Sequence, residues 1–362
     1  MQPQQSSMRV RKTPVTEDSM IEDSLPSLVL LNSARKSGVL RVEPETALEF
    51  LREYQRMTAK PSGTWEQKLC DSQYPFWSSL SMSDMEIEHQ IDLTTVTTLA
   101  SILRRSKSKG QLVLARKVML TASALGDKSA TFDIISSAIR IGNFNGLTAP
   151  LQRLDHLANK DNDPQALSLL GQIYYARQEK KQALEYFRKA TGPPTGNLEF
   201  FGAGEALVNE GKILIEMDDK DGAKVAFEKA ALELDEPSGY FYLSKMQEPG
   251  SSQEQVYLLK AASSGIQEAW HNLGALEMMK RKDNATLKPK TIADFGMAYE
   301  WFQVAAADGF GLSMLNLALM CKSVGNIEEG RKWLEKAEEN EDVRDQARAI
   351  KANFHDDNVD AI

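Results

Sequence analysis

Cysteine and histidine are both scarce in this 362-residue sequence, which contains two cysteines and four histidines. Cys70 and Cys321 lie too far apart to suggest a disulfide framework or the paired spacing of a zinc site. This usage favours a reducing compartment. The histidines are scattered, with no nearby cysteine or serine in a recognisable nucleophile context: His89, His156, His271 and His355.

Aromatic residues, long apolar runs and excess positive charge are lacking as well. Aromatic residues make up 7% of the chain, and the alternation of apolar and polar residues that marks strands is nearly absent, so we expect an all-α protein. No apolar run approaches the length of a membrane span. The net charge is −8, opposite in sign to that of a typical nucleic-acid binder.

Small and aromatic residues recur in a fixed pattern instead. Gly171, Tyr174, Ala183, Phe187 and Ala190 are separated in the same way as two further sets, which are Gly211, Leu214, Ala223, Phe227, Ala230 and Ala318, Cys321, Gly330, Leu334, Ala337. The last alanine of each set belongs to a series spaced 31 to 44 residues apart: Ala122, Ala158, Ala190, Ala230, Ala261, Ala305 and Ala337. The chain is therefore built from repeats.

The pattern is typical of paired helices. Two antiparallel helices approach closely only where small side chains face each other, so Gly171 and Ala183 are expected at the contact, beside Tyr174 and Phe187. Ala190 then allows the next pair to stack on this one. Short runs that end in Gly126, Gly265 and Gly309 are expected to close one helix before the next begins, and Asn162 is expected to do the same.

The spacing resembles the tetratricopeptide family and, because the repeat length varies, its relative the Sel1-like repeat. The residues that carry this resemblance are Ala261-Ala262 through Gly265 and Ala305-Ala306 through Gly309, with Trp270 through Gly274 opening a pair in the tetratricopeptide manner. The resemblance implies a right-handed α-solenoid of about seven antiparallel helix pairs.

The sequence divides into four expected regions. Residues 1–40 are polar and interrupted by prolines, so we expect them to be mostly disordered. Residues 41–91 are expected to hold a helix, Glu43 to Met57, and an aromatic segment that caps the first repeat. Residues 92–340 form the repeat array, with an insertion between Lys280 and Ala298, and residues 341–362 form an acidic helix and tail.

No residue pattern supports catalysis, a cofactor or a metal. Acid pairs such as Glu328-Glu329 are expected on solvated helix faces, and no glycine-rich phosphate loop is present. The basic cluster of Arg104, Arg105, Lys107 and Lys109 is expected to form a solvated turn rather than a phosphate-binding patch. We therefore expect a protein that is not an enzyme, with no cofactor and no metal site.

The resemblance places the candidate partner-binding site on the first helix of each pair, which in this family lines the concave groove. The residues expected there are Gln172, Tyr175, Asn209, Lys212, His271, Asn272, Met278, Asn316 and Lys322. Asn209, Asn272 and Asn316 each lie two residues before a small residue that begins a repeat motif, namely Gly211, Gly274 or Ala318. Such amides suit hydrogen bonding to an extended peptide. An equally good explanation of these three asparagines is that asparagine is simply frequent at this position in Sel1-like repeats.

These observations favour a scaffold or adaptor that binds a protein or peptide partner in complex assembly or regulation. One alternative is a mitochondrial assembly or translation factor, since related repeat arrays have such roles in mitochondria. Another is an organelle RNA-binding factor. Nucleic acid is an unlikely partner given the charge. We expect an intracellular, cytoplasmic protein, with the mitochondrial matrix as the alternative, although Glu17, Glu22 and Asp23 are unusual for a presequence.

Overall fold

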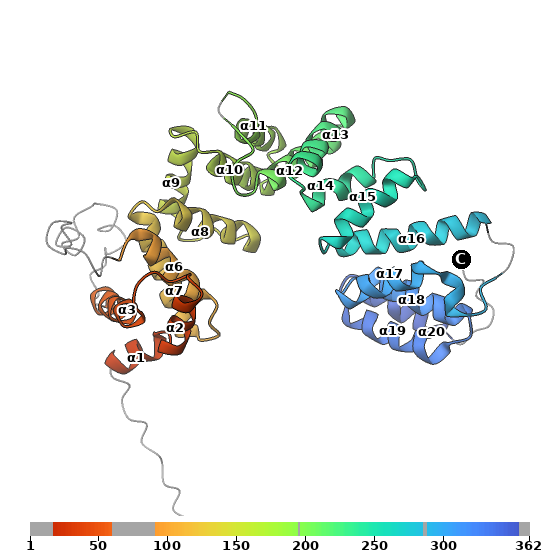
Figure 1. Cartoon of the computed structure of the whole chain (residues 1–362), viewed down its shortest axis with the longest axis horizontal. Coiled ribbons are helices and arrows are strands. Elements are labelled where there is room, and N and C mark those ends of the chain that lie inside the picture. Colours follow the sequence, from red (N-terminus) through yellow and green to blue (C-terminus); the bar gives the residue numbers. More distant parts are fainter. Residues whose placement is uncertain (1–16, 60–90, 195, 285–287, 355–362) are drawn as a thin grey trace, which may run out of the picture. The chain divides into compact units, whose positions relative to one another are not determined.

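The computed structural model describes residues 17–59, 91–194, 196–284 and 288–354, and these are helical with no strand among them (Figure 1). The all-α prediction is thereby confirmed for the described chain. The protein divides into two compact units, residues 1–170 and 171–362. We describe each unit by itself.

Unit 1 is built from short helices, most of which pack on their neighbours in the sequence, whereas its first helix packs on later ones. Its core holds the fully buried side chains of Leu31, Leu51, Leu99 and Leu103. The helices are α1 (Glu17–Ser24), α2 (Leu28–Lys36), α3 (Pro44–Ala59), α6 (Leu93–Arg104), α7 (Lys109–Ala124), α8 (Lys128–Ile141), α9 (Thr148–Asn159) and the first part of α10 (Pro164–Ala176).

The expectation that residues 1–40 are mostly disordered is wrong for residues 17–40. Helices α1 and α2 and the residues that follow each bury Ile21, Leu25, Leu31 and Leu40, which are at most 7% exposed, in the same core as α3, α6 and α7. These four side chains come from two short helices and their ends, so they show no sustained period in the sequence. Residues 1–16 lie outside the described residues.

The helix predicted over Glu43 to Met57 is confirmed as α3. Its buried face carries Ala47, Leu51 and Tyr54, and the Tyr54 hydroxyl lies 2.8 Å from the Thr121 hydroxyl of α7. The aromatic segment that was expected to cap the first repeat falls within residues 60–90, outside the described residues.

Unit 2 continues the series of helix pairs. Each first helix packs against the second helix of its own pair and against the preceding second helix. After the end of α10, the elements are α11 (Lys180–Thr191), α12 (Ala203–Glu216), α13 (Lys220–Glu228), the π-helix η1 (Lys229–Glu233), α14 (Pro237–Ser244), α15 (Ser252–Ser263), α16 (Gln267–Asn284), the 3₁₀-helix η2 (Ile292–Phe295), α17 (Met297–Ala307), α18 (Gly311–Ser323), α19 (Ile327–Glu339) and α20 (Arg344–Ala352).

The expected contact between small and aromatic residues is present within the pairs. A Cβ atom built on Gly171 would lie 2.7 Å from the ring of Phe187, and one on Gly274 would lie 2.7 Å from the ring of Phe302. Gly211 meets the ring of Phe227 in the same way. The three phenylalanines are at most 1% exposed, so each pair is closed by a large ring against a glycine.

Helix ends also follow the sequence prediction. Gly265 and Gly309 both have φ of 93°, and Gly126 has φ of 112°, a region that suits glycine. Asn162 takes the same role with φ of 51°. New helices then begin at side-chain caps, as where Ser251 accepts a hydrogen bond from the amide of Glu254 at 3.1 Å.

The last described helix, α20, differs from its prediction. It carries Arg344, Arg348 and Lys351 against the single acid Asp345, so the helix itself is not acidic. The ring of Phe354, 1% exposed, packs near Gly330 of α19 and anchors the end of α20. The acidic tail predicted after it, residues 355–362, lies outside the described residues.

Candidate functional site

Three asparagines occupy equivalent positions on first helices of unit 2. Asn209 lies on α12, Asn272 on α16 and Asn316 on α18, and all three are half-buried. None of their amides makes a hydrogen bond within the part of the chain that the structure describes. Each amide therefore keeps its donor and acceptor groups unpaired within the described residues.

The asparagines do not lie on consecutive pairs. Helix α14 comes between α12 and α16, and neither α14 nor α15 contains asparagine. Helix α14 presents aromatic residues instead: Lys245 Nζ lies 4.3 Å from the ring centroid of Phe241 and 5.6 Å from that of Tyr242. The polar series is therefore interrupted by an aromatic pair.

A connected polar cluster lies between the first two pairs of unit 2. The Tyr175 hydroxyl donates to Oε1 of Glu216 at 3.2 Å, and Lys212 Nζ lies 5.4 Å from the centroid of the Tyr175 ring. Lys180 pairs with Oε2 of Glu216 at 2.9 Å, and this hydrogen bond holds the pKa of that carboxyl below its usual range. Tyr175 and Lys212 were predicted for the site, whereas Glu216 and Lys180 were not.

Acidic groups follow along α12, the start of α14 and α16. Desolvation raises the pKa of Glu205, and the nearby carboxylate of Glu236 raises it further. Desolvation also raises the pKa of Tyr242, with a smaller contribution from the charge of Glu268. Glu205 makes no ion pair within the described residues, and the charge of Lys212 offsets the rise of its pKa only in part.

His271 is held within the fold. Its Nδ1 lies 2.9 Å from the buried Ser313 hydroxyl of α18, and its ring lies 5.3 Å from that of Phe302 and 4.9 Å from that of Phe310. Burial lowers the pKa of His271 below its usual value. The residue thus connects α16 to α18 as a neutral imidazole at pH 7.

The remaining predicted residues divide between packing and exposure. Met278 packs against the core of α17 to α20. Lys322 Nζ donates to the carbonyl of Asn353 at 3.2 Å and lies 5.4 Å from the ring centroid of Phe354, so it fastens α20. Gln172 is half-buried and makes no hydrogen bond within the described residues.

The basic cluster of unit 1 lies in the turn between α6 and α7, as expected. The guanidinium of Arg104 forms an ion pair with Asp133 and donates to the Ser137 hydroxyl at 3.1 Å, both on α8. Part of the positive charge of this turn is therefore already compensated within the fold.

Cys321 is fully buried, as expected for an apolar group. Its Sγ lies 3.8 Å from the Tyr299 hydroxyl, and burial raises the pKa of both groups, that of Tyr299 to about 12. Among the described residues, no group of three or more His, Cys, Asp or Glu side chains is arranged to hold a metal ion. None of the helices in the described part of the chain has the length and apolar character needed to cross a membrane.

A known family model matches two of the helix pairs. The tetratricopeptide repeat family model matches residues 164–192 and 204–236, which hold the pairs α10/α11 and α12/α13. No curated protein matches the chain. Among solved structures, a protective antigen present in uropathogenic Escherichia coli strains, displaying an SLR fold, is similar at 17% identity and a TM-score of 0.48, with 90% of this chain and 70% of that chain covered.

The two matched segments share their closing contact with a third pair outside them. Gly171 and Gly211 meet Phe187 and Phe227 inside the matched segments, and Gly274 meets Phe302 beyond them. Residues 164–192 and 204–236 thus match tetratricopeptide repeats, and the later described helices of unit 2 continue the same arrangement of packed helix pairs.

Proposed function

We propose that this protein is a non-enzymatic scaffold that binds an extended segment of a partner protein along the first helices of unit 2, in the assembly or regulation of a complex. The observation that carries the proposal is the placement of Asn209, Asn272 and Asn316 at equivalent positions, each with an amide that has no partner among the described residues. A side-chain amide offers both a donor and an acceptor, which matches the alternating groups of a peptide backbone.

The charge of this face indicates what the partner segment carries. Glu205 has a raised pKa and no ion pair within the described residues, and Glu236 and Glu268 add negative charge nearby. A lysine or arginine side chain of the partner would compensate these carboxylates. The aromatic pair Phe241 and Tyr242, between the asparagines, would contact apolar side chains of the same segment.

Site-specific photo-crosslinking tests this proposal. A photoreactive amino acid is placed at Asn272 and, in a second variant, at Asn316, and the crosslinked partner peptides are sequenced by mass spectrometry. Because one extended segment would pass both positions, both probes should label the same partner within one short stretch.

The matched controls place the same probe at Lys224 of α13 and Glu335 of α19, which are exposed residues on second helices. These positions should not label that stretch. If Asn272 and Asn316 label unrelated proteins, or if only the second helices label the partner, the proposal is wrong.

A further inference from the structure

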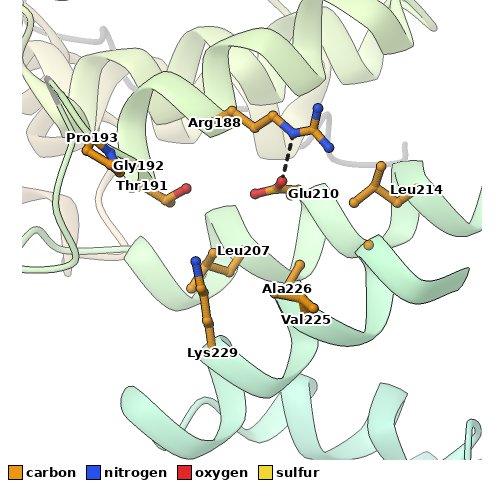
Figure 2. A pocket seen from close by; sticks show the side chains of 11 residues that line it. Arg188, Thr191, Gly192, Pro193, Leu207, Glu210, Leu214, Val225, Ala226 and Lys229 are labelled. Atoms are coloured by element: carbon orange, nitrogen blue, oxygen red, sulfur yellow. Dashed lines mark hydrogen bonds and ion pairs between the residues drawn. The ribbon is translucent and has the colours of Figure 1, made fainter. Parts of the chain in front are cut away.

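A hollow lies between α11 and α13, on the side of α12 opposite the candidate site (Figure 2). Its volume is about 400 Å³, within the range of about 300–1,000 Å³ that ligand pockets occupy. It is lined by Arg188, Thr191, Gly192, Pro193, Leu207, Glu210, Leu214, Gly222, Val225, Ala226 and Lys229. On α12, Leu207, Glu210 and Leu214 point about 200° away from Asn209, Lys212 and Glu216, at about 100° per residue. This hollow is therefore separate from the candidate site on the first helices.

The hollow coincides with a missing aromatic ring. The second helices α11, α13 and α17 each have a buried Phe that packs against a glycine of the first helix, and α19 has Leu334 at this position. The residue before this Phe or Leu is Tyr186 in α11, Trp301 in α17 and Trp333 in α19, but in α13 it is Ala226. Where the ring is present, it fills space: Tyr186 stacks on Tyr174 at 5.2 Å, and Trp333 is 9% exposed. Ala226 leaves the equivalent space beside it unfilled.

A lysine remains in place above the missing ring. In α11, Lys189 Nζ lies 5.6 Å from the Tyr186 centroid, and in α19, Lys336 Nζ lies 4.3 Å from the Trp333 centroid. Lys229 has the same position relative to Ala226, and it makes no ion pair, hydrogen bond or ring contact within the described residues. The cation that elsewhere covers a ring has none to cover in this repeat.

Two more positions of this pair differ from those of most other pairs. In three other pairs, a buried leucine precedes the small residue of the first helix: Leu170, Leu273 and Leu317. Here this position holds Glu210, whose side chain is 12% exposed and forms an ion pair with Nε of Arg188 at 3.0 Å. Val225 is 52% exposed where α11, α17 and α19 carry Glu185, Glu300 and Lys332, and α15 also carries an exposed valine, Val256. The rim thus offers an apolar contact at Val225.

The balance of charge around the hollow is positive. Glu210 uses one Arg188 nitrogen, and the terminal nitrogens of Arg188 and the ammonium of Lys229 have no partner in the described chain. Figure 2 shows Arg188 and Lys229 reaching the hollow from opposite helices. An acidic group next to an entering apolar side chain would meet both cations.

We propose that this hollow binds an aromatic side chain, preferably tryptophan, from an acidic segment of a partner protein. The partner's ring takes the place of the ring that Ala226 lacks, with Lys229 above it, and a neighbouring carboxylate binds Arg188. This interaction is independent of peptide binding along the first helices, because it uses the opposite face of α12.

The test uses a fluorescein-labelled peptide, Gly-Ser-Glu-Trp-Glu-Ser-Gly, and measures its binding to the full chain by fluorescence anisotropy. Replacing the tryptophan by alanine, or both glutamates by lysine, should weaken binding at least tenfold. Ala226→Trp should weaken binding of the original peptide at least tenfold, because the chain's own indole fills the hollow. Ala226→Ser keeps the hollow and should bind normally.

A second pair of variants distinguishes a specific loss of binding from a general loss of folding. Lys229→Ala should weaken binding at least threefold, whereas Lys224→Ala, one turn earlier on α13 and outside the hollow, should not. The proposal is overturned if the peptide does not bind, if the alanine peptide binds equally well, or if a folded Ala226→Trp protein binds normally. Concentration-dependent dimers that Ala226→Trp abolishes would show a second copy of the chain as the occupant, and would overturn the assignment to a separate partner.

Discussion

A Cβ atom built on Gly171 would lie 2.7 Å from Cε1 of Phe187, closer than side chains approach in folded proteins. In the α18/α19 pair the same two positions hold Ala318 and Leu334, both fully buried. The larger first residue is thus matched by a smaller second residue, so the size of one position sets the size of the other.

Gly171→Ala is therefore expected to destabilise the protein by about 1–3 kcal/mol, the usual cost of overpacking a core. Adding Phe187→Leu should recover part of this loss, because the double variant recreates the pairing of Ala318 and Leu334. Chemical denaturation of both single variants and the double variant measures the coupling. Strictly additive losses would show that the two positions do not constrain each other.

Ala183→Asp should destabilise the protein by more than about 3 kcal/mol, because it buries a carboxylate with no partner. Ala183 is fully buried in α11, whereas its neighbour Gln182 is exposed. Gln182→Asp should consequently change the free energy of unfolding by less than about 0.5 kcal/mol. Equal effects at the two positions would contradict the assigned helix face.

Much of this architecture could be predicted from the sequence because it depends on local rules. The Gly171 and Phe187 spacing predicts the helix contact, and Gly265 and Gly309 predict the helix ends, since few other residues suit those positions. Burial of Leu31 and Leu40 could not be predicted in the same way. It depends on long-range packing of short helices that have no sustained period.

The repeat register predicts which helices carry the candidate residues, but it does not predict their contacts. The repeat register correctly places Asn209, Asn272 and Asn316 on first helices. It does not reveal that the His271 ring is held by Ser313, because that contact joins different pairs. The hollow beside Ala226 was not predicted from the sequence, because it depends on the positions of the surrounding helices.

The pH dependence of stability should reveal the environment of His271. Because burial lowers its pKa in the folded state, the unfolded chain binds a proton more readily. The stabilising contribution is complete above the unfolded pKa of about 6.5 and is lost as the pH falls from there toward the lower folded pKa. Denaturation between pH 5 and 7.5 should therefore show a shallower slope for His271→Gln than for the unmodified chain. Parallel slopes would place His271 in a solvent-like environment.

RNA binding should be weak at physiological salt, because phosphate contacts supply most such affinity and the chain has a net charge of −8. Filter binding with total cellular RNA measures this directly. Arg104→Glu combined with Arg105→Glu should change the retained fraction little, since Arg104 is already paired with Asp133. Tight, steeply salt-dependent retention that this double variant abolishes would favour a nucleic-acid function.

The most direct test of the central claim is the affinity of the crosslinked partner segment for the variant Asn209→Ala, Asn272→Ala, Asn316→Ala, measured by titration calorimetry. The control variant is Gln182→Ala, Lys224→Ala, Glu335→Ala, which alters exposed residues on second helices. The account predicts at least tenfold weaker binding to the asparagine variant, with its melting temperature and the control's affinity unchanged. Unchanged affinity in the asparagine variant, or weaker binding that only follows from early melting, would contradict it.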